Sequence, residues 1–196
     1  LAAPIPIISY DVAQTPAPGF GGWSHAYSGA ITDTGRIIPA GSEPGGSTGC
    51  PCAVLNYSGG SGTINDLVVP TTIDAVHLLT NRTTPDGLPI EPVITLYLGG
   101  NFRINQIKVF GGEVGSNFIP GLLDGATVEI AGQSVHLTTL ASTPTTDLLD
   151  LTGTPLANLE TDRIILRNIT ASFFGFPLDQ FSIAEITVDG APVTVS

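Results

Sequence analysis

Short apolar runs alternate with polar residues along most of the chain, and Gly or Pro separates one run from the next. The alternation is clearest in six runs of the second half: Val93–Leu98, Ile104–Phe110, Thr127–Ile130, Gln133–Thr139, Arg163–Ile169 and Ile183–Val188. A period of two is typical of β-strands with one buried face. Ala131-Gly132 stands between two of these runs and predicts a tight hairpin turn, because glycine supplies the positive φ that such turns need.

The first half of the chain predicts further elements with a weaker pattern. In order, these are an edge strand Pro4–Val12, a strand Gly21–Ile31, a loop Thr34–Gly49, a short strand Cys52–Tyr57 and a glycine turn Ser58–Gly62. The prolines of the first strand cannot donate to a β-ladder, which places it at a sheet edge. Within Thr63–Thr84, the segment Thr72–Leu79 fits a strand or one or two helical turns, and periodicity does not decide between them.

The order of these elements predicts an all-β fold. The strands follow one another without amphipathic helices between them, which favours an antiparallel β-sandwich of jelly-roll type. Two weaker segments complete the picture: Ala141–Pro155 is expected to be a connection, and Pro192–Val195 a short last strand. All-β sandwiches often reach 196 residues as one domain, so we expect a single domain over residues 1–196.

Composition narrows the possible partners. The 6 Lys and Arg face 17 Asp and Glu, for a net charge of −11, and no basic cluster could neutralise phosphates. Nucleic acid is therefore excluded as a partner, and an anionic membrane surface is disfavoured. Leu1–Ile8 is apolar but too short and proline-rich for a signal or membrane segment, and the chain lacks Met; together these features predict a mature secreted protein.

The two cysteines form the sequence Cys50-Pro51-Cys52. A disulfide across one intervening residue closes a strained ring, so both a bridge and two free thiols remain open. A structural zinc site would need four ligands, and no second cysteine pair is present.

Three segments, taken in order, resemble the discoidin, or coagulation factor 5/8 type C, group of galactose-binding-like domains. They are Val93–Gly100 followed by Ile104–Gly111, then Gly125–Gly132, and finally Arg163–Arg167 with Phe181–Gly190. The resemblance runs from about Asp66 to Gly190 and leaves residues 1–60 as an N-terminal extension of strands and a loop. Tyr97 departs from it by standing where an Asp is usual, and Val76-His77-Leu78 replaces a tryptophan-containing loop. The resemblance implies a jelly-roll module that binds sugars, lipids or proteins and is not an enzyme.

The resemblance also implies a structural Ca²⁺ beside the closing strand. The matching positions are Glu185 and Asp66, with Thr71 or Thr72 nearby. Oxygen ligands of this kind suit Ca²⁺. The alternative is that Glu185 is buried and hydrogen-bonded while Asp66 caps a turn.

Two segments supply candidate ligand-binding residues. In the first, Trp23, His25 and Tyr27 could stack on a sugar ring with Arg36 binding hydroxyls; alternatively these aromatic side chains face the core. The second holds Asn81, Arg82 and Asp86 in a turn-rich loop, although Asp86-Gly87 also fits an ordinary turn. Phe173–Phe176 is expected in the core rather than as an exposed apolar loop.

Three sequons, at Asn56, Asn81 and Asn168, are potential glycosylation sites if the protein passes through a eukaryotic secretory pathway. Enzyme motifs are missing: the three His are not at metal-ligand spacing, and there is no nucleophile-elbow, zinc-protease or phosphate-loop pattern.

The resulting hypothesis is an extracellular, non-catalytic module that binds carbohydrate or acts in cell adhesion, with a glycan or a surface protein as its partner. The alternative is a structural or interaction protein of a cell surface, matrix or particle.

Overall fold

A computed structural model of the chain describes residues 3–18, 25–39, 51–69, 77–111, 122–143, 146–173 and 176–193. Within these residues it contains thirteen strands, two short 3-10 helices and no α-helix. The strands are β1 Ala3–Ile5, β2 Ile7–Pro16, β3 Ala30–Ile38, β4 Cys52–Gly60, β5 His77–Thr80, β6 Val93–Gly111, β7 Leu122–Ile130, β8 Gln133–Thr138, β9 Leu140–Thr143, β10 Thr146–Asp150, β11 Glu160–Phe173, β12 Phe176–Leu178 and β13 Gln180–Pro192; the 3-10 helices are η3 Thr63–Asn65 and η4 Pro155–Asn158. Every strand pairing is antiparallel, as the sequence predicted.

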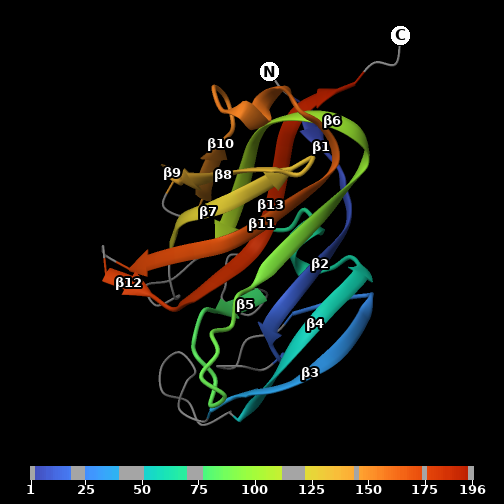
Figure 1. The fold of residues 1–196 in the computed structure, drawn as a ribbon. Helices are drawn as coiled ribbons and strands as arrows, with labels where there is room; N and C mark the ends of the chain where they lie inside the picture. Colours follow the sequence, from blue (N-terminus) through green and yellow to red (C-terminus); the bar gives the residue numbers. More distant parts are fainter. Residues whose placement is uncertain are drawn as a thin grey trace.

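The strand β6 connects the two layers of the sandwich and is the longest in the molecule (Figure 1). Its first half pairs with β2 and β11, in a layer with the order β3-β4-β2-β6-β11-β7-β8. Its second half pairs with β13 and β10, while β1 and β5 add to β13 and β9 adds to β10. The two strands predicted at Val93–Leu98 and Ile104–Phe110 are therefore one continuous strand that passes from one layer to the other.

One hydrophobic core lies between the layers. Alternation along β6 and β11 buries Ile94, Leu96 and Ile164 from the first layer, and these residues share a cluster with Ile107 and Ile186 of the second. Each of these side chains is at most 1% exposed. Burying an aliphatic side chain of this size stabilises a fold by about 1.5–3 kcal/mol.

A second, smaller hydrophobic core covers the outer face of the first part of β13, so that this part of the strand is not exposed to solvent on either face. Ile38 of β3, Val54 of β4, Leu78 of β5, Ile90 and Ala184 of β13 form a separate buried cluster. Residues 180–186 of β13 are accordingly buried on both faces. The N-terminal segment thus contributes to both layers and to this second core.

The hairpin predicted at Ala131-Gly132 is confirmed. Ile130 pairs with Gln133, and the two turn residues have φ angles of 51° and 79°. Positive φ at both central positions is the backbone pattern of the tight turns that match strand twist.

Several predictions for the first half were wrong. The predicted edge strand Pro4–Val12 is divided between β1, which holds Pro4 and among the described strands pairs only with β13, and β2. β2 lies between β4 and β6, so the edge prediction was wrong for this part. Residues 25–29 form only an isolated bridge, Tyr27 to Gly62, and the strand begins at Ala30. Trp23 and the rest of 21–24 lie outside the described residues.

The predicted loop and turn that followed were also too long. Thr34–Ile38 belongs to β3, since Ile37 and Ile38 pair with Ala53 and Cys52. Ser58–Gly60 continues β4. In the ambiguous segment Thr72–Leu79, His77–Leu79 belong to β5, which agrees with the strand interpretation, and residues 72–76 lie outside the described residues. The short helix η3 precedes this segment. The connection predicted at Ala141–Pro155 contains most of β9 and all of β10. Pro192 ends β13 rather than beginning a new strand.

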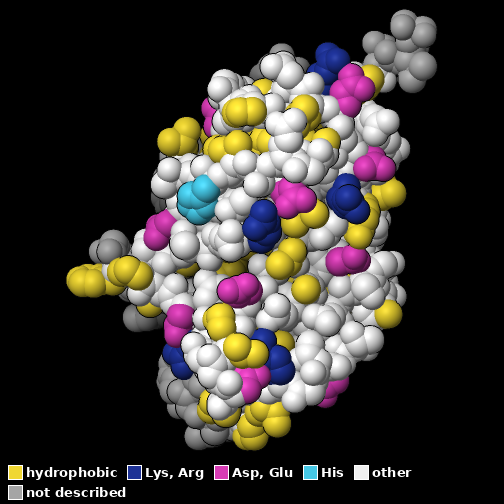
Figure 2. Space-filling model, in the orientation of Figure 1, with side chains coloured by type: hydrophobic (Ala, Val, Ile, Leu, Met, Phe, Trp, Pro, Cys, Tyr) yellow, Lys and Arg dark blue, Asp and Glu magenta, His cyan; other side chains and the backbone are white. Residues whose placement is uncertain are grey.

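Two further features bear on the sequence analysis. Cys52 is disulfide-bonded, so of the two alternatives left open by the sequence, the bridge is present and free thiols are not. The sequence has one other cysteine, Cys50. Phe176 is 73% exposed, so the core placement expected for this phenylalanine was wrong. It lies in β12, at the tip of a projecting hairpin where hydrophobic side chains gather on the surface (Figures 1 and 2). None of the described residues belongs to a helix long and apolar enough to span a membrane.

Candidate functional site

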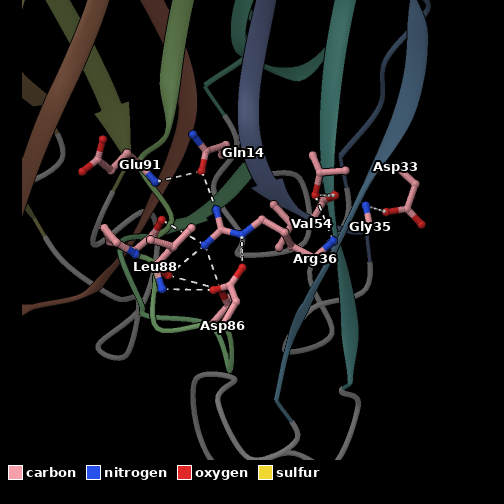
Figure 3. Close-up of polar contacts among 11 residues, drawn as sticks. Gln14, Asp33, Gly35, Arg36, Val54, Asp86, Leu88 and Glu91 are labelled. Carbon is pink, nitrogen blue, oxygen red and sulfur yellow. Dashed lines mark hydrogen bonds and ion pairs between the residues drawn. The ribbon is translucent and has the colours of Figure 1, made fainter.

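Arg36 and Asp86 come from two segments that the sequence analysis treated separately, and the structure brings them together (Figure 3). Arg36 lies near the end of β3, while Asp86 lies in the loop between β5 and β6. The Nε atom of Arg36 is 3.2 Å from Oδ2 of Asp86, and Nη1 donates to Oε1 of Gln14 at 2.8 Å. The side chain of Arg36 is 19% exposed, so this ion pair is partly shielded from water.

The other end of the guanidinium holds the backbone of the same loop. Nη2 of Arg36 donates to Oγ1 of Thr84 at 2.7 Å, to the carbonyl of Leu88 at 2.8 Å and to that of Pro89 at 3.1 Å. Most donors of Arg36 are thereby used within the protein. Arg36 therefore holds residues 84–89 against β3, and a ligand would have to bind to the neighbouring residues rather than to the guanidinium.

Asp86 remains ionised at neutral pH. Its carboxylate accepts from the hydroxyl of Thr84 and, at 3.0 Å, from the N–H of Leu88. The bond from Thr84 has the largest effect, followed by the bond from Leu88 and then the contact with Arg36; together they hold the pKa of Asp86 below its usual range. The local sequence Thr84-Pro85-Asp86-Gly87 explains the geometry, because Asp bonds the backbone two residues ahead and Gly87 takes a φ of 80°.

An open hollow of about 260 Å³ lies against this pair, lined by Gly35, Arg36, Ile37, Thr84, Pro85 and Asp86. We call it the Arg36–Asp86 hollow. The Asp86 side chain is 44% exposed and Ile37 is 51% exposed. The hollow therefore combines an ionised acceptor with apolar surface, which can orient a polar ligand that also has an apolar face. The hydroxyl of Thr84 is buried and bonded to Asp86 and Arg36.

The remaining candidates of the same loop lie elsewhere. Nδ2 of Asn81 donates to the carbonyl of Ile169 at 2.8 Å, and Nε of Arg82 is 2.9 Å from Oδ2 of Asp179. Asn81 lines a second hollow of about 220 Å³, together with Pro89, Ile90, Glu91, Pro92, Asn168, Ile169 and Thr170. Neither Asn81 nor Arg82 contributes to the Arg36–Asp86 hollow.

His25 and Tyr27 lie in a partly buried aromatic cluster away from that hollow. The Tyr27 hydroxyl donates to the carbonyl of Tyr10 at 2.6 Å and accepts from the N–H of Gly60 at 2.7 Å. Its ring packs against that of Tyr57, with centroids 5.0 Å apart. The polar atom of Tyr27 is thus engaged with the protein's own backbone, as the core-facing alternative expected.

The structure brings the expected calcium ligands Asp66 and Glu185 together. Glu185 is fully buried, and its Oε2 and Oε1 accept from the N–H groups of Leu67 at 2.7 Å and Ile186 at 3.1 Å. Burial, together with the adjacent Asp66 carboxylate, raises the pKa of Glu185 to about 7. Asp66 also accepts from the N–H of Val68 at 2.9 Å, as a turn cap does. Thr71 and Thr72 lie outside the described residues.

All three sequon asparagines make side-chain hydrogen bonds. Oδ1 of Asn56 accepts from the N–H of Gln14 at 2.9 Å, and Nδ2 of Asn168 donates to Thr127 at 3.2 Å, besides the bond of Asn81 described above. A glycan attaches to Nδ2, the atom that donates in the contacts of Asn81 and Asn168, whereas the contact of Asn56 uses Oδ1.

The sequence analysis missed Gln14 and Thr84 as parts of the site. Thr84 belongs to the turn sequence Thr84-Pro85-Asp86-Gly87, so the turn signal could have drawn attention to it, although its bond to Asp86 follows only from the fold. Gln14 carried no comparable signal. It is a strand residue with a positive φ of 56°, and only the folded register places it beside Arg36.

Comparisons with known proteins give the following. No family model and no curated protein matches the chain. Among solved structures, a module named CBM32-5 from Clostridium perfringens, in complex with GalNAc-beta-1,3-galactose, aligns over 84% of this chain and 95% of its own, at 13% identity and a TM-score of 0.43. A GH31 CBM32-2 module bound to GalNAc aligns over 84% of this chain and 97% of its own, at 14% identity and a TM-score of 0.40. A fucose-binding module from Streptococcus pneumoniae aligns over 86% of this chain and 96% of its own, at 12% identity and a TM-score of 0.39. These three solved structures are carbohydrate-binding modules, and the likeness to them agrees with a galactose-binding-like, discoidin-like fold.

Proposed function

We propose that the protein is an extracellular, non-catalytic carbohydrate-binding module whose ligand occupies the Arg36–Asp86 hollow. The observation that carries this proposal is the ion pair that joins β3 to the loop between β5 and β6 beside an open hollow. A site that lies on loops at the end of a rigid sandwich is held in place without needing to close on its ligand.

The chemistry of the hollow suits a neutral sugar. The ionised Asp86 accepts hydrogen bonds from sugar hydroxyls, while Ile37 and Pro85 offer apolar contact to the C–H face of a ring. An acidic sugar fits poorly, because Arg36 already spends its donors on protein acceptors and the chain carries a net charge of −11. Binding is expected to be weak, since an open site buries little ligand surface.

An extracellular location is supported by the disulfide at Cys52. Disulfides persist in oxidising compartments and are rare in the cytosol. The acidic, lysine-poor surface is consistent with that location.

We predict that Asp86→Asn weakens glycan binding at least tenfold. A carboxylate that accepts sugar hydroxyls contributes about 1.5–3 kcal/mol through each charge-assisted bond, and an amide offers one acceptor instead of two. The measurement is isothermal titration calorimetry with GalNAc, galactose and fucose, preceded by a glycan array to select the best ligand. Two of these sugars are those that the similar modules are bound to or named for.

The matched control for this variant is Glu160→Gln. Glu160 forms an ion pair with Arg103 at 2.7 Å, and its side chain is 45% exposed, against 44% for Asp86. The Glu160→Gln substitution also removes one negative charge, from a position on β11 that is as exposed as Asp86. Equal binding by the two variants, or no bound glycan for the unaltered protein, would reject the hollow as the sugar site.

We further propose that Ca²⁺ binds at Asp66 and Glu185. Carboxylates are the hard oxygen donors that Ca²⁺ prefers, and a cation would offset the cost of burying the Glu185 charge. Among the described residues no three His, Cys, Asp or Glu side chains gather as a metal site, so carbonyl oxygens and water would complete the shell.

Addition of Ca²⁺ is expected to raise the melting temperature relative to EDTA. Binding to the folded state alone stabilises it by about 2.7 kcal/mol at a concentration 100 times Kd. Asp66→Asn should abolish the response while keeping the turn, because Asn also accepts the N–H of Val68. Asp150→Asn, in a similar turn with Thr152, is the control that should keep it. Equal melting temperatures in Ca²⁺ and EDTA would leave Glu185 as a buried acid without a cation.

A further inference from the structure

Two of the three histidines of the chain meet inside the aromatic cluster. The Nδ1 atoms of His25 and His77 are 2.6 Å apart, and the ring centroids are 3.8 Å apart with an interplanar angle of 80°. His77 lies in β5 and is 2% exposed, while His25 lies in the segment before β3. At this separation one Nδ1 must carry a proton and the other must not, because two N–H groups would repel each other.

The outer nitrogens of the pair contact hydroxyl groups on the same strand. Nε2 of His77 is 2.5 Å from Oγ1 of Thr15, and Nε2 of His25 is 3.0 Å from the hydroxyl of Tyr10. The backbone N–H of Ile64 donates to the Tyr10 oxygen, which leaves the phenolic proton for His25. We therefore assign one direction to the chain of bonds: Tyr10 to His25, His25 to His77, and His77 to Thr15. Both imidazoles are neutral in this arrangement and every bond has its proton.

The surroundings of the pair oppose any positive charge. The ionisable groups packed against it are tyrosines: Tyr10 on β2, Tyr27 beside His25, and Tyr57 on β4, whose ring centroid lies 5.0 Å from His25 and 5.4 Å from His77. Asp66 acts on Tyr10 at the η3 end and Asp11 on Tyr27, but among the described residues no carboxylate forms an ion pair with either imidazole. Burial lowers the pKa of His25 to about 4 and that of His77 well below its usual range, where the neighbouring His25 lowers it further.

We propose that the His25–His77 contact is an acid-sensitive latch that fastens residues 25–29 to β2 and β5. A second proton at the contact sets N–H against N–H and breaks the bond between the rings. The segment makes further hydrogen bonds within the protein, of which the side-chain bonds of Ser28 are exposed: Ala26 and Ser28 bond to residues 61–63, and Tyr27 to Tyr10 and Gly60. We expect acid to break this contact and loosen residues 25–29 before the rest of the sandwich unfolds. Neither histidine lines the Arg36–Asp86 hollow.

The sign of the pH effect follows from the lowered pKa values. A histidine whose pKa is lower in the folded state contributes stability that is complete above the unfolded value of about 6.5 and is lost as the pH falls towards the folded value. Two buried acids act in the opposite direction: burial raises the pKa of Glu185 to about 7 and that of Asp147 to about 6, so their protonation favours the folded state as the pH falls. Global stability mixes these effects, and a local readout is required.

Trp23, the only tryptophan, stands two positions before His25 in the sequence and provides that readout. We expect its fluorescence to change cooperatively between about pH 6.5 and pH 4 while the far-ultraviolet circular dichroism of the β-sandwich stays constant. His77→Gln should remove this transition, since Gln bonds without titrating in this range. His136→Gln is the control, because His136 is exposed on β8 and should leave the transition unchanged.

A second measurement covers the case in which His77→Gln does not fold. Histidine-selective ¹⁵N NMR of the unaltered protein shows three imidazoles, with exposed His136 as the internal reference. Two of them should stay neutral well below pH 6.5 and share one proton between their Nδ1 atoms. Three independent titrations near pH 6.5, or fluorescence that stays constant from pH 8 to pH 4, would overturn the latch.

Discussion

Gly111→Ala is expected to destabilise the fold by about 3 kcal/mol or more, as measured by urea unfolding. A Cβ atom at position 111 would lie 2.1 Å from the carbonyl oxygen of Ser182 and 3.0 Å from its carbonyl carbon. Both atoms belong to the backbone of β13, which pairs with β6 at this point through Ile183. A backbone held in a ladder cannot yield as a flexible side chain does, so the cost exceeds that of ordinary overpacking.

Gly100→Ala is the matched control on the same strand. Its Cβ would meet nothing closer than the Phe102 ring at 3.7 Å, which is ordinary contact, and the position is exposed. We expect a change within about 0.5 kcal/mol. Similar midpoints for the two variants would show that β6 and β13 do not approach each other in the register described.

Phe181→Ala should cost about 3–5 kcal/mol of unfolding free energy. Phe181 is fully buried and is among the largest side chains of the core. It lies in β13 opposite Leu79 of β5, within a stretch that is buried on both faces. Removing the ring loses the free energy gained by burying it and leaves a cavity. The cavity cannot close easily because β13 is held by its hydrogen bonds to β5 and β6.

Phe176→Ala makes the same chemical change on the surface. Phe176 is 73% exposed on the projecting hairpin, so its removal should alter stability by no more than about 0.5 kcal/mol. A loss for Phe176→Ala as large as that for Phe181→Ala would mean that the hairpin tip is covered rather than exposed.

The strands of the second half could be predicted because their evidence is local. Alternating apolar residues in Arg163–Ile169 or Ile183–Val188 encode a buried face whatever the partner strand is, and Ala131-Gly132 encodes its own turn. The first half failed where tertiary pairing overrides local signals. Gly35 suggested a loop, yet it sits with a φ of 75° inside β3, where the register shifts between Asp33 and Ile37. The irregular pairing at Gly35 is imposed by β4, and the residues next to Gly35 in the sequence carry no information about that strand.

The candidate sites show the same division. Asp86 and its turn were visible in the sequence, but its partner Arg36 is 50 residues away and was considered for a different segment. Asp66 and Glu185, 119 positions apart in the numbering, were brought together only by the family resemblance, and the structure places them in contact. His77 was noticed only as a departure from the family pattern. Its contact with His25, 52 residues away, follows from the pairing of β5 with β13 and the path of the chain over β2.

The continuity of β6 has a consequence for how the molecule can come apart. The strand supplies central ladders to both layers, so neither layer can form its hydrogen bonds unless β6 is already extended. A partly folded species that retains either layer must therefore retain β6, and the peripheral strands β3 and β8 can detach without it. Folding and unfolding of the two layers are thereby coupled through a single backbone segment, which makes the sandwich one cooperative unit bordered by strands that open independently.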